Sequence, residues 1–361
     1  MKHSTGLRAV AAVGLALGVA ATPVLNRAPH AGAARQPAVS GKIGFLFSDF
    51  TTSDRWKFDR SYYLAAIKSL DPGVTVEIRD AKANQTTQQT QAQSLLTSGV
   101  KALIDVPTDS TQAAQIVNLA HQNKPRVPVI AYDRLINNAP VDAYVSFDGF
   151  AVGKQQARYL VQHLKKGATI VSIAGSPTDN NAKLFHDGAM SVLKPAGFKI
   201  AYDKYTPNWD PNTAQAEASS ALTQNKNKVD AILVANDGMA AGVVAALQGQ
   251  KLLGKVYVTG QDATVPGLQA ILEGNQSMTI YKPLRKLASA AAQITDELLK
   301  GHKVMSTTTT PNGAGNIPTT LLPVITVTKS NIAATVVKDG YVTKAQLCAG
   351  AAASACKSAG L

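Results

Sequence analysis

The chain has very few cysteines and lacks the common signatures of a catalytic site. Only Cys348 and Cys356 occur among its 361 residues, and the six histidines are dispersed. Neither a C-x-x-C pair nor a Cys and His spacing typical of a metal site is present. A G-x-S-x-G turn, an H-E-x-x-H helix, a P-loop and a G-x-G-x-x-G turn after a strand are also missing. These absences argue against the common redox, hydrolytic and nucleotide-dependent enzymes.

Long hydrophobic runs are equally scarce, and the one that exists lies at the beginning of the chain. Residues 9–25 are uncharged, follow Lys2 and Arg8, and precede small residues at 31–34. This order is typical of a secretory signal peptide, although an uncleaved membrane anchor is the alternative because the run is just long enough to span a bilayer. We predict a signal peptide and linker over residues 1–40 and a soluble protein exported to the periplasm or the exterior of the cell envelope.

Clusters of basic residues are absent too. The net charge is +13, yet no block of Lys and Arg is longer than a pair such as Lys165 and Lys166. Without a nucleic-acid motif, this charge indicates a solvated surface of mixed sign, and we expect no nucleic-acid partner. In an exported protein, Cys348 and Cys356 would form a disulfide that closes a small terminal loop, and the alanine-rich stretch between them would have to break.

From Lys42 onward, short apolar runs alternate with longer segments of helical period, which is typical of βα units and a parallel sheet. The runs form two consecutive series. The first series comprises 42–47, 75–81, 100–107, 127–133 and 143–148, and the second comprises 168–175, 198–205, 230–236, 256–262 and 277–282.

We therefore predict an α/β fold of two doubly wound parallel-sheet lobes with a cleft between them. The N-terminal lobe would comprise residues 41–148 plus about 283–322, and the C-terminal lobe residues 149–282 plus about 323–361. A last extended segment at 321–328 would cross back between the lobes and help to make a multi-crossing hinge.

Polar side chains follow four of the predicted strands: Asp133 with Arg134, Asn236 with Asp237, Gln261 with Asp262, and Lys282. Side chains at the carboxyl ends of parallel strands point into the crevice where ligands bind, so we expect these groups to converge. Carboxylates accept hydrogen bonds, Arg and Lys donate them, and Asn does both, which suits adjacent hydroxyls. Each residue alone is as compatible with a solvated loop or a helix cap, but four together favour one binding site without a nucleophile.

Three further features fit such a site, each with an alternative. Trp56 and Trp209 lie in polar loops and could stack on the apolar face of a sugar, with core packing as the alternative. The turn SPTDNNAK contains Asp179 and Asn181, which could meet a ligand or form an Asx turn that opens a helix. Asp237 is as compatible with a helix cap as with a ligand contact.

The segments KIGFLF, AYDRLIN, VSFD, GSPTDNNAKLF, VANDG, GQDA and MTIYKP, in this order, resemble the sugar-binding branch of the type I periplasmic binding proteins. The resemblance covers about residues 42–345 and is strongest to the D-xylose-binding members. It implies two lobes, joined by three hinge crossings, that close on one monosaccharide and deliver it to the permease of an ABC transporter. A chemotaxis receptor is a further partner that the resemblance leaves open, and no cofactor is implied.

The resemblance also adds Arg55 to the site and assigns the remaining positions. The implied ligand-binding set is Arg55, Trp56, Asp133, Arg134, Asp179, Asn181, Trp209, Asn236, Asp262 and Lys282. The sugar would lie between the two tryptophans. Lys282 favours D-xylose, because ribose-binding members carry an amide at this position. Departures before Trp56, at Gly149 and at His186 leave the exact sugar open.

Three other functions compete with this interpretation. The ligand could be another pentose or hexose, such as ribose, arabinose or glucose. A sugar-responsive transcription regulator would need a helix-turn-helix ahead of the first strand, where the apolar leader lies instead. A glycosidase could use Asp133 and Asp262 as its carboxylate pair, but Arg134 would keep Asp133 ionised and oppose a general-acid role. We therefore expect no enzymatic activity and no metal.

Overall fold

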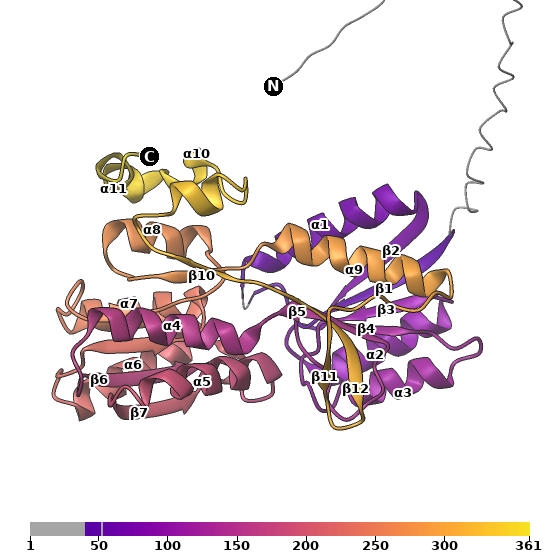
Figure 1. Cartoon of the computed structure of the whole chain (residues 1–361), viewed down its shortest axis with the longest axis horizontal. Coiled ribbons are helices and arrows are strands. Elements are labelled where there is room, and N and C mark those ends of the chain that lie inside the picture. The colour runs from indigo at the N-terminus through magenta and orange to yellow at the C-terminus, as the bar shows by residue number, and fades with distance from the viewer. Residues whose placement is uncertain (1–39, 52) are drawn as a thin grey trace, which may run out of the picture. The chain divides into compact units, whose positions relative to one another are not determined.

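A computed structural model describes residues 40–51 and 53–361 of the chain. Ala38–Leu361 form one unit, in which two parallel sheets with helices on their faces make two lobes (Figure 1). Apart from its last residue, the predicted signal peptide and linker lie outside the described residues. Within the described ranges, we find no helix of the length and apolarity that crossing a membrane requires.

The first lobe contains a seven-stranded sheet in the order β11-β12-β5-β4-β3-β1-β2. All neighbouring strands are parallel except β11, which is antiparallel to β12. The strands are β1 (Ser40–Phe47), β2 (Gly73–Asp80), β3 (Ala102–Asp105), β4 (Val129–Tyr132), β5 (Ala143–Phe147), β11 (Thr308–Pro311) and β12 (Asn316–Leu322). The helices of this lobe are α1 (Arg55–Leu70), α2 (Gln85–Thr97), α3 (Ala114–Gln122) and α9 (Leu284–Leu299).

The second lobe contains a four-stranded parallel sheet in the order β7-β6-β8-β9. Its strands are β6 (Thr169–Ala174), β7 (Lys199–Tyr205), β8 (Ala231–Val234) and β9 (Tyr257–Val258). Its helices are α4 (Gly149–His163), α5 (Asn180–Leu193), α6 (Pro211–Gln224), α7 (Asp237–Gly249) and α8 (Val265–Glu273), with a short 3-10 turn, η1 (Pro207–Trp209), before α6.

The apolar runs form these strands because both faces of each sheet are covered. In β1, Ile43, Phe45, Leu46 and Phe47 are all fully buried, although their side chains alternate between the two faces. Gly44 is required between them, since a Cβ there would lie 2.7 Å from the Leu103 side chain. The central strands of this sheet therefore appear in the sequence as continuous apolar runs rather than as alternating apolar and polar residues.

The fifth predicted strand of the second series does not join the parallel sheet. It forms β10 (Thr279–Tyr281), which pairs in an antiparallel manner with β13 (Ile325–Val327). The single segment predicted at 321–328 is split between β12 and β13, and the hairpin β11-β12 was not predicted at all. Prolines at 311 and 318 obscure this hairpin in the sequence, and the pairing of β12 with β5 is a tertiary effect.

The chain passes between the two lobes three times. It does so after β5, between β10 and α9, and between β12 and β13 (Figure 1). This arrangement agrees with the predicted fold class of two lobes and a multi-crossing hinge. The residue bounds of the lobes stay a prediction.

The C-terminal segment packs on the second lobe. It contains η2 (Ala333–Val337), α10 (Lys344–Leu347), η3 (Gly350–Ala352) and α11 (Ala353–Ser358), and the last three elements contact α8. Cys348 and Cys356 are joined by a disulfide. The alanine-rich stretch between them breaks at Gly350, whose φ of +62° is in the left-handed region. The Gln269 side chain of α8 donates a hydrogen bond to the Leu347 carbonyl at 3.1 Å, which fastens the segment to this helix.

Candidate functional site

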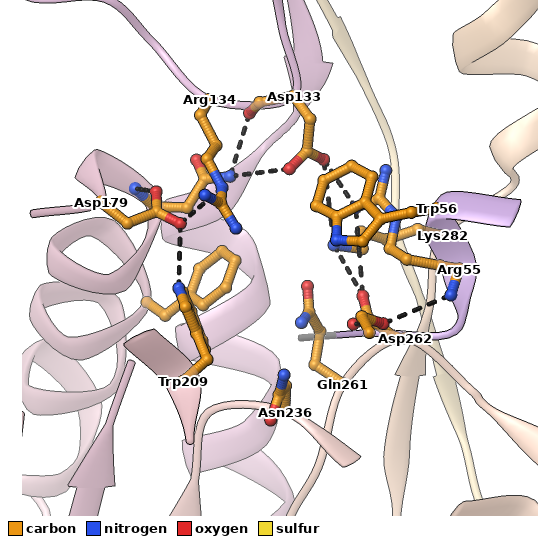
Figure 2. A pocket seen from close by; sticks show the side chains of 13 residues that line it. Arg55, Trp56, Asp133, Arg134, Asp179, Trp209, Asn236, Gln261, Asp262 and Lys282 are labelled. Atoms are coloured by element: carbon orange, nitrogen blue, oxygen red, sulfur yellow. Dashed lines mark hydrogen bonds and ion pairs between the residues drawn. The ribbon is translucent and has the colours of Figure 1, made fainter. Parts of the chain in front are cut away.

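A cavity lies at the carboxyl ends of the strands, between the two lobes (Figure 2). All ten residues of the predicted ligand-binding set line it. Sequence reasoning left Ser53, Phe185 and Gln261 out of that set, and they line the cavity as well.

The secondary structure explains why these residues meet. Asp133 and Arg134 follow β4, Asn236 follows β8, Asp262 comes shortly after β9, and Lys282 follows β10. The expected geometry of parallel strand ends therefore holds for the first three segments. Lys282 reaches the cavity from the antiparallel pair β10-β13, and α1 supplies Arg55 and Trp56 with its first residues.

Arg55 is the centre of the charged part of the site. Its Nη1 lies 2.7 Å from Asp133 Oδ1, and its Nε lies 2.9 Å from Asp59 Oδ2. Burial alone would lower the pKa of Arg55, but the nearby carboxylates outweigh it and hold the pKa well above the usual value. A buried cation of this kind is tolerated only when it is paired.

Asp262 and Asp133 share two cations. Asp262 Oδ1 lies 2.9 Å from Lys282 Nζ, and the Ser53 hydroxyl donates to Asp262 Oδ2 at 2.6 Å. Asp133 Oδ1 is 4.0 Å from Lys282 Nζ. Burial alone would raise the pKa of Asp133, but Arg55 and Lys282 outweigh it and hold the pKa below the usual value. Asp133 is therefore an ionised hydrogen-bond acceptor.

A second ion pair crosses the cleft. Arg134 of the first lobe places its Nε 2.7 Å from Asp179 Oδ2 of the second. Asp179 Oδ2 also accepts a hydrogen bond from the Trp209 indole N–H at 3.2 Å. Asp179 Oδ1 accepts one from the backbone N–H of Asn181 at 2.8 Å. The last bond caps α5, so Asp179 forms the Asx turn named as the alternative and also lines the cavity.

Trp56 and Trp209 are both buried and both line the cavity, so core packing and a place at the site are compatible. Their exposed fractions are 3% and 5%. The guanidinium carbons of Arg55 and Arg134 lie 4.5 and 5.5 Å from the centre of the Trp56 ring, which orients this ring through cation–π contacts. Phe185 meets the Trp209 ring edge-on at 6.2 Å between centroids.

Three residues of the site have left-handed backbone conformations. The φ angles are +64° at Asp133, +55° at Trp209 and +97° at Asp262. Non-glycine residues adopt such angles at a cost and only when the surroundings impose them, as happens at functional sites. The Ser146 hydroxyl donates to the Asp133 carbonyl at 2.6 Å, and the Tyr341 hydroxyl donates to the Asp262 carbonyl at 3.2 Å. These bonds hold the two carboxylate-bearing peptides in place.

Asn236 has both of the roles that the sequence left open, whereas Asp237 has neither. Asn236, a predicted ligand residue, is the N-cap of α7 and accepts from the Met239 amide at 2.9 Å, while it also lines the cavity. Asp237 is neither that cap nor part of the lining. It accepts hydrogen bonds from Thr264 and Thr279, and burial raises its pKa to about 7. Asp237 therefore supports the loop that carries Asp262.

In the part of the chain that the structure describes, no group of three or more His, Cys, Asp or Glu side chains is placed to hold a metal ion. The chemistry that the site offers is hydrogen bonding by ionised carboxylates and amides, together with stacking on two indole rings.

Gly175, directly after β6, sets the position of the Trp209 ring. A Cβ at Gly175 would lie 2.1 Å from Cη2 of Trp209, closer than any real contact. We expect Gly175→Ala to displace the ring from the cavity wall and to weaken ligand binding by about tenfold or more, measured by calorimetry. Gly249→Ala is the control, because nothing lies within 4 Å of the added Cβ. Equal affinities for the two variants would show that the ring position does not matter.

Asp105 at the end of β3 is fully buried, and neither carboxyl oxygen accepts a hydrogen bond from a described residue. Burial raises its pKa to about 8, although Arg134 opposes the shift. A carboxyl whose pKa is raised on folding stabilises the fold below its unfolded pKa of about 3.9 and loses that contribution as the pH rises through its folded pKa.

We therefore expect the free energy of unfolding to fall between about pH 4 and pH 8, and to fall less in Asp105→Asn. Over this range the fall should be larger in the unaltered protein by about 1 to 3 kcal/mol, measured by urea denaturation at several pH values. Asp237 titrates in the same direction but is present in both proteins. Parallel stability curves would contradict a role for Asp105.

Together, the fold and the site define a bilobed binding protein with its cavity at the strand ends. The family model of the periplasmic binding protein domain matches residues 43–303. The chain therefore belongs to the periplasmic binding protein family, and its fold is of type I.

Individual relatives agree with this assignment. The chain is 40% identical to the D-xylose-binding periplasmic protein of Escherichia coli over 310 residues, which are 85% of this chain and 92% of that protein. It is 33% identical to the multiple sugar-binding periplasmic receptor ChvE of Rhizobium radiobacter, over 96% of this chain and all of that protein. A carbohydrate transporter solute binding protein from Chloroflexus aurantiacus, solved in complex with D-glucose, has a TM-score of 0.77 and 33% identity, covering 86% of this chain and 98% of that one.

Proposed function

We propose that this protein binds one neutral monosaccharide, preferentially D-xylose, in the cavity between its lobes and delivers it to the permease of an ABC transporter. The observation that carries the proposal is the composition of the cavity. Carboxylates from both lobes and amides from the second lobe line it together with two indole rings, so the hydroxyls and the apolar face of a sugar both find partners.

The charges of the site support a neutral ligand. Arg55 is paired with Asp59 and Asp133, Lys282 is paired with Asp262, and Arg134 is paired with Asp179. Each cation is therefore already compensated by a buried carboxylate. An anionic sugar acid or sugar phosphate would have to compete with these carboxylates, and no unpaired cation would offset the free-energy cost of desolvating its charge.

The choice of D-xylose rests on the relatives and on Lys282. The curated relatives from Escherichia coli and Haemophilus influenzae are named as D-xylose-binding periplasmic proteins. Lys282 is the residue by which the sequence resembles the xylose-binding members rather than the ribose-binding ones. D-glucose is the second candidate, because the solved relative from Chloroflexus aurantiacus binds it.

The same contacts support binding without catalysis. Asp133 is kept ionised and is held between cations, so it has no proton to donate to a leaving group. The ligand would instead favour closure of the lobes, because residues of both lobes contact it. The periplasmic location of the relatives supports export of this chain, in keeping with the predicted signal peptide.

Titration calorimetry of the mature chain tests the function. The panel is D-xylose, D-ribose, L-arabinose, D-glucose and the sugar acid D-xylonate, with p-nitrophenyl xyloside as a test for hydrolysis. We expect binding of D-xylose at least tenfold tighter than that of the other sugars, no binding of xylonate and no release of nitrophenol. Absence of binding to every sugar at millimolar concentration would overturn the proposal.

A further inference from the structure

Three buried acceptor oxygens of the cavity accept no hydrogen bond from a described residue: Asn181 Oδ1, Gln261 Oε1 and Asp262 Oδ1. Asp262 Oδ1 is compensated by its ion pair with Lys282 at 2.9 Å, which leaves Asn181 Oδ1 and Gln261 Oε1, both on the second lobe. Buried polar atoms are nearly always paired, and an unpaired one costs about 1 to 3 kcal/mol. Asn181 belongs to the ligand-binding set that the sequence predicts, whereas Gln261 does not.

The backbone around Gln261 is held in place by its neighbours. Its carbonyl accepts a hydrogen bond from the Asp237 amide at 2.9 Å. The preceding Gly260 packs so closely that a Cβ there would lie 2.1 Å from Asp237 Oδ1. The side chain is only 2% exposed, and Figure 2 shows it between Asn236 and Asp262. Gln261 is therefore presented to the cavity by a rigid support.

The orientation of the Gln261 amide follows from the end of β8. Its Nε2 points to the carbonyl of Ala235, at 3.5 Å. Turning the amide over would bring two oxygens together, so Oε1 is the atom that remains for the cavity. The side-chain cations of this region are engaged elsewhere, since Lys282 lies 2.9 Å from Asp262 and Arg55 lies 2.7 Å from Asp133.

We propose that Gln261 Oε1 accepts a hydrogen bond from one hydroxyl of the bound monosaccharide, and that Gln261 is thereby a specificity-determining residue of the site. The inference rests on the proposed sugar-binding function. It requires a ligand hydroxyl that acts as a donor at this corner of the cavity. A sugar that lacks that hydroxyl, or carries fluorine in its place, leaves the oxygen unpaired.

The test is a thermodynamic double-mutant cycle, in which one change is made in the protein and the other in the sugar. Gln261→Met keeps an unbranched side chain of similar length and removes the acceptor. Calorimetry compares the unaltered protein and this variant on D-xylose, on its 2-, 3- and 4-deoxyfluoro derivatives, and on 1,5-anhydroxylitol, which lacks the anomeric hydroxyl. Gln248→Met on the exposed side of α7 is the control for the substitution itself.

We expect Gln261→Met to bind D-xylose about 5- to 100-fold more weakly, while Gln248→Met binds it as the unaltered protein does. At one of the four positions, loss of the hydroxyl should weaken binding by the unaltered protein at least fivefold more than binding by Gln261→Met. Equal penalties for the two proteins at all four positions would overturn the inference, and so would an unchanged affinity of Gln261→Met.

The role of Gln261 can be disproved while the proposed sugar-binding function still holds. If the unaltered protein binds D-xylose but Gln261→Met shows no such coupling, only the role of Gln261 is lost. If the unaltered protein binds no sugar, both are lost. Should Gln261→Met prove unfolded by circular dichroism, Gln261→Leu takes its place in the same cycle, with the same criterion.

Discussion

Replacing Arg55 with methionine should lower the free energy of unfolding by about 3 to 5 kcal/mol and abolish sugar binding. The substitution leaves two carboxylates, those of Asp59 and Asp133, buried without the cation that compensates them. Methionine fills part of the volume but offers no charge. Urea denaturation measures the loss of stability, and calorimetry measures the loss of binding.

The matched control for Arg55→Met is Arg60→Met on the same helix. Arg60 is exposed, so this change should alter the free energy of unfolding by no more than about 0.5 kcal/mol. If Arg55→Met is as stable as Arg60→Met, the buried ion pairs of Arg55 are not what holds the first lobe's side of the cavity together.

The second large effect is expected for Asp262→Ala, which should weaken D-xylose binding by about 2 to 4 kcal/mol, or roughly 30- to 1000-fold. The change removes a carboxylate at the cavity wall and strands its partners. Among the described residues, Asp133 at 4.0 Å is then the one carboxylate left to pair with Lys282, and the Ser53 hydroxyl loses its acceptor. Calorimetry measures the dissociation constant directly.

Two further variants separate the causes of this loss. Asp262→Asn keeps the shape but not the charge, so it should bind more tightly than Asp262→Ala and more weakly than the unaltered protein. Asp54→Ala removes an exposed carboxylate that pairs with Lys57 and should leave binding unchanged. An unaltered dissociation constant in Asp262→Ala would place this residue outside the site.

Much of the site could be predicted because strand ends leave a visible pattern. Asp133, Asn236 and Asp262 each follow an apolar run, and the parallel sheets bring such positions together whatever the loops do. Arg55 gives no such signal, because it lies at the start of a helix among other charged residues. Only the resemblance to a family assigned it.

The remaining features depend on tertiary contacts that no local pattern reveals. The left-handed backbone at Asp133 and Asp262 is imposed by hydroxyl groups of Ser146 and Tyr341, which are distant in the chain or on another strand. Gln261 was predicted to lie at a strand end beside Asp262, but the resemblance to the family did not include it in the ligand-binding set. The antiparallel partner of β10 could not be foreseen, because pairing direction is not encoded in the strand itself.

The placement of β12 also constrains how the protein can be synthesised and divided. This strand joins the first lobe's sheet beside β5, and α9 packs against α1, yet both elements come from the last quarter of the chain. A fragment that ends after β5 would expose an unpaired sheet edge and an uncovered helix face, both prone to aggregation. The first lobe therefore completes its fold only after the second has been made, and a single cut cannot separate the two as independent domains.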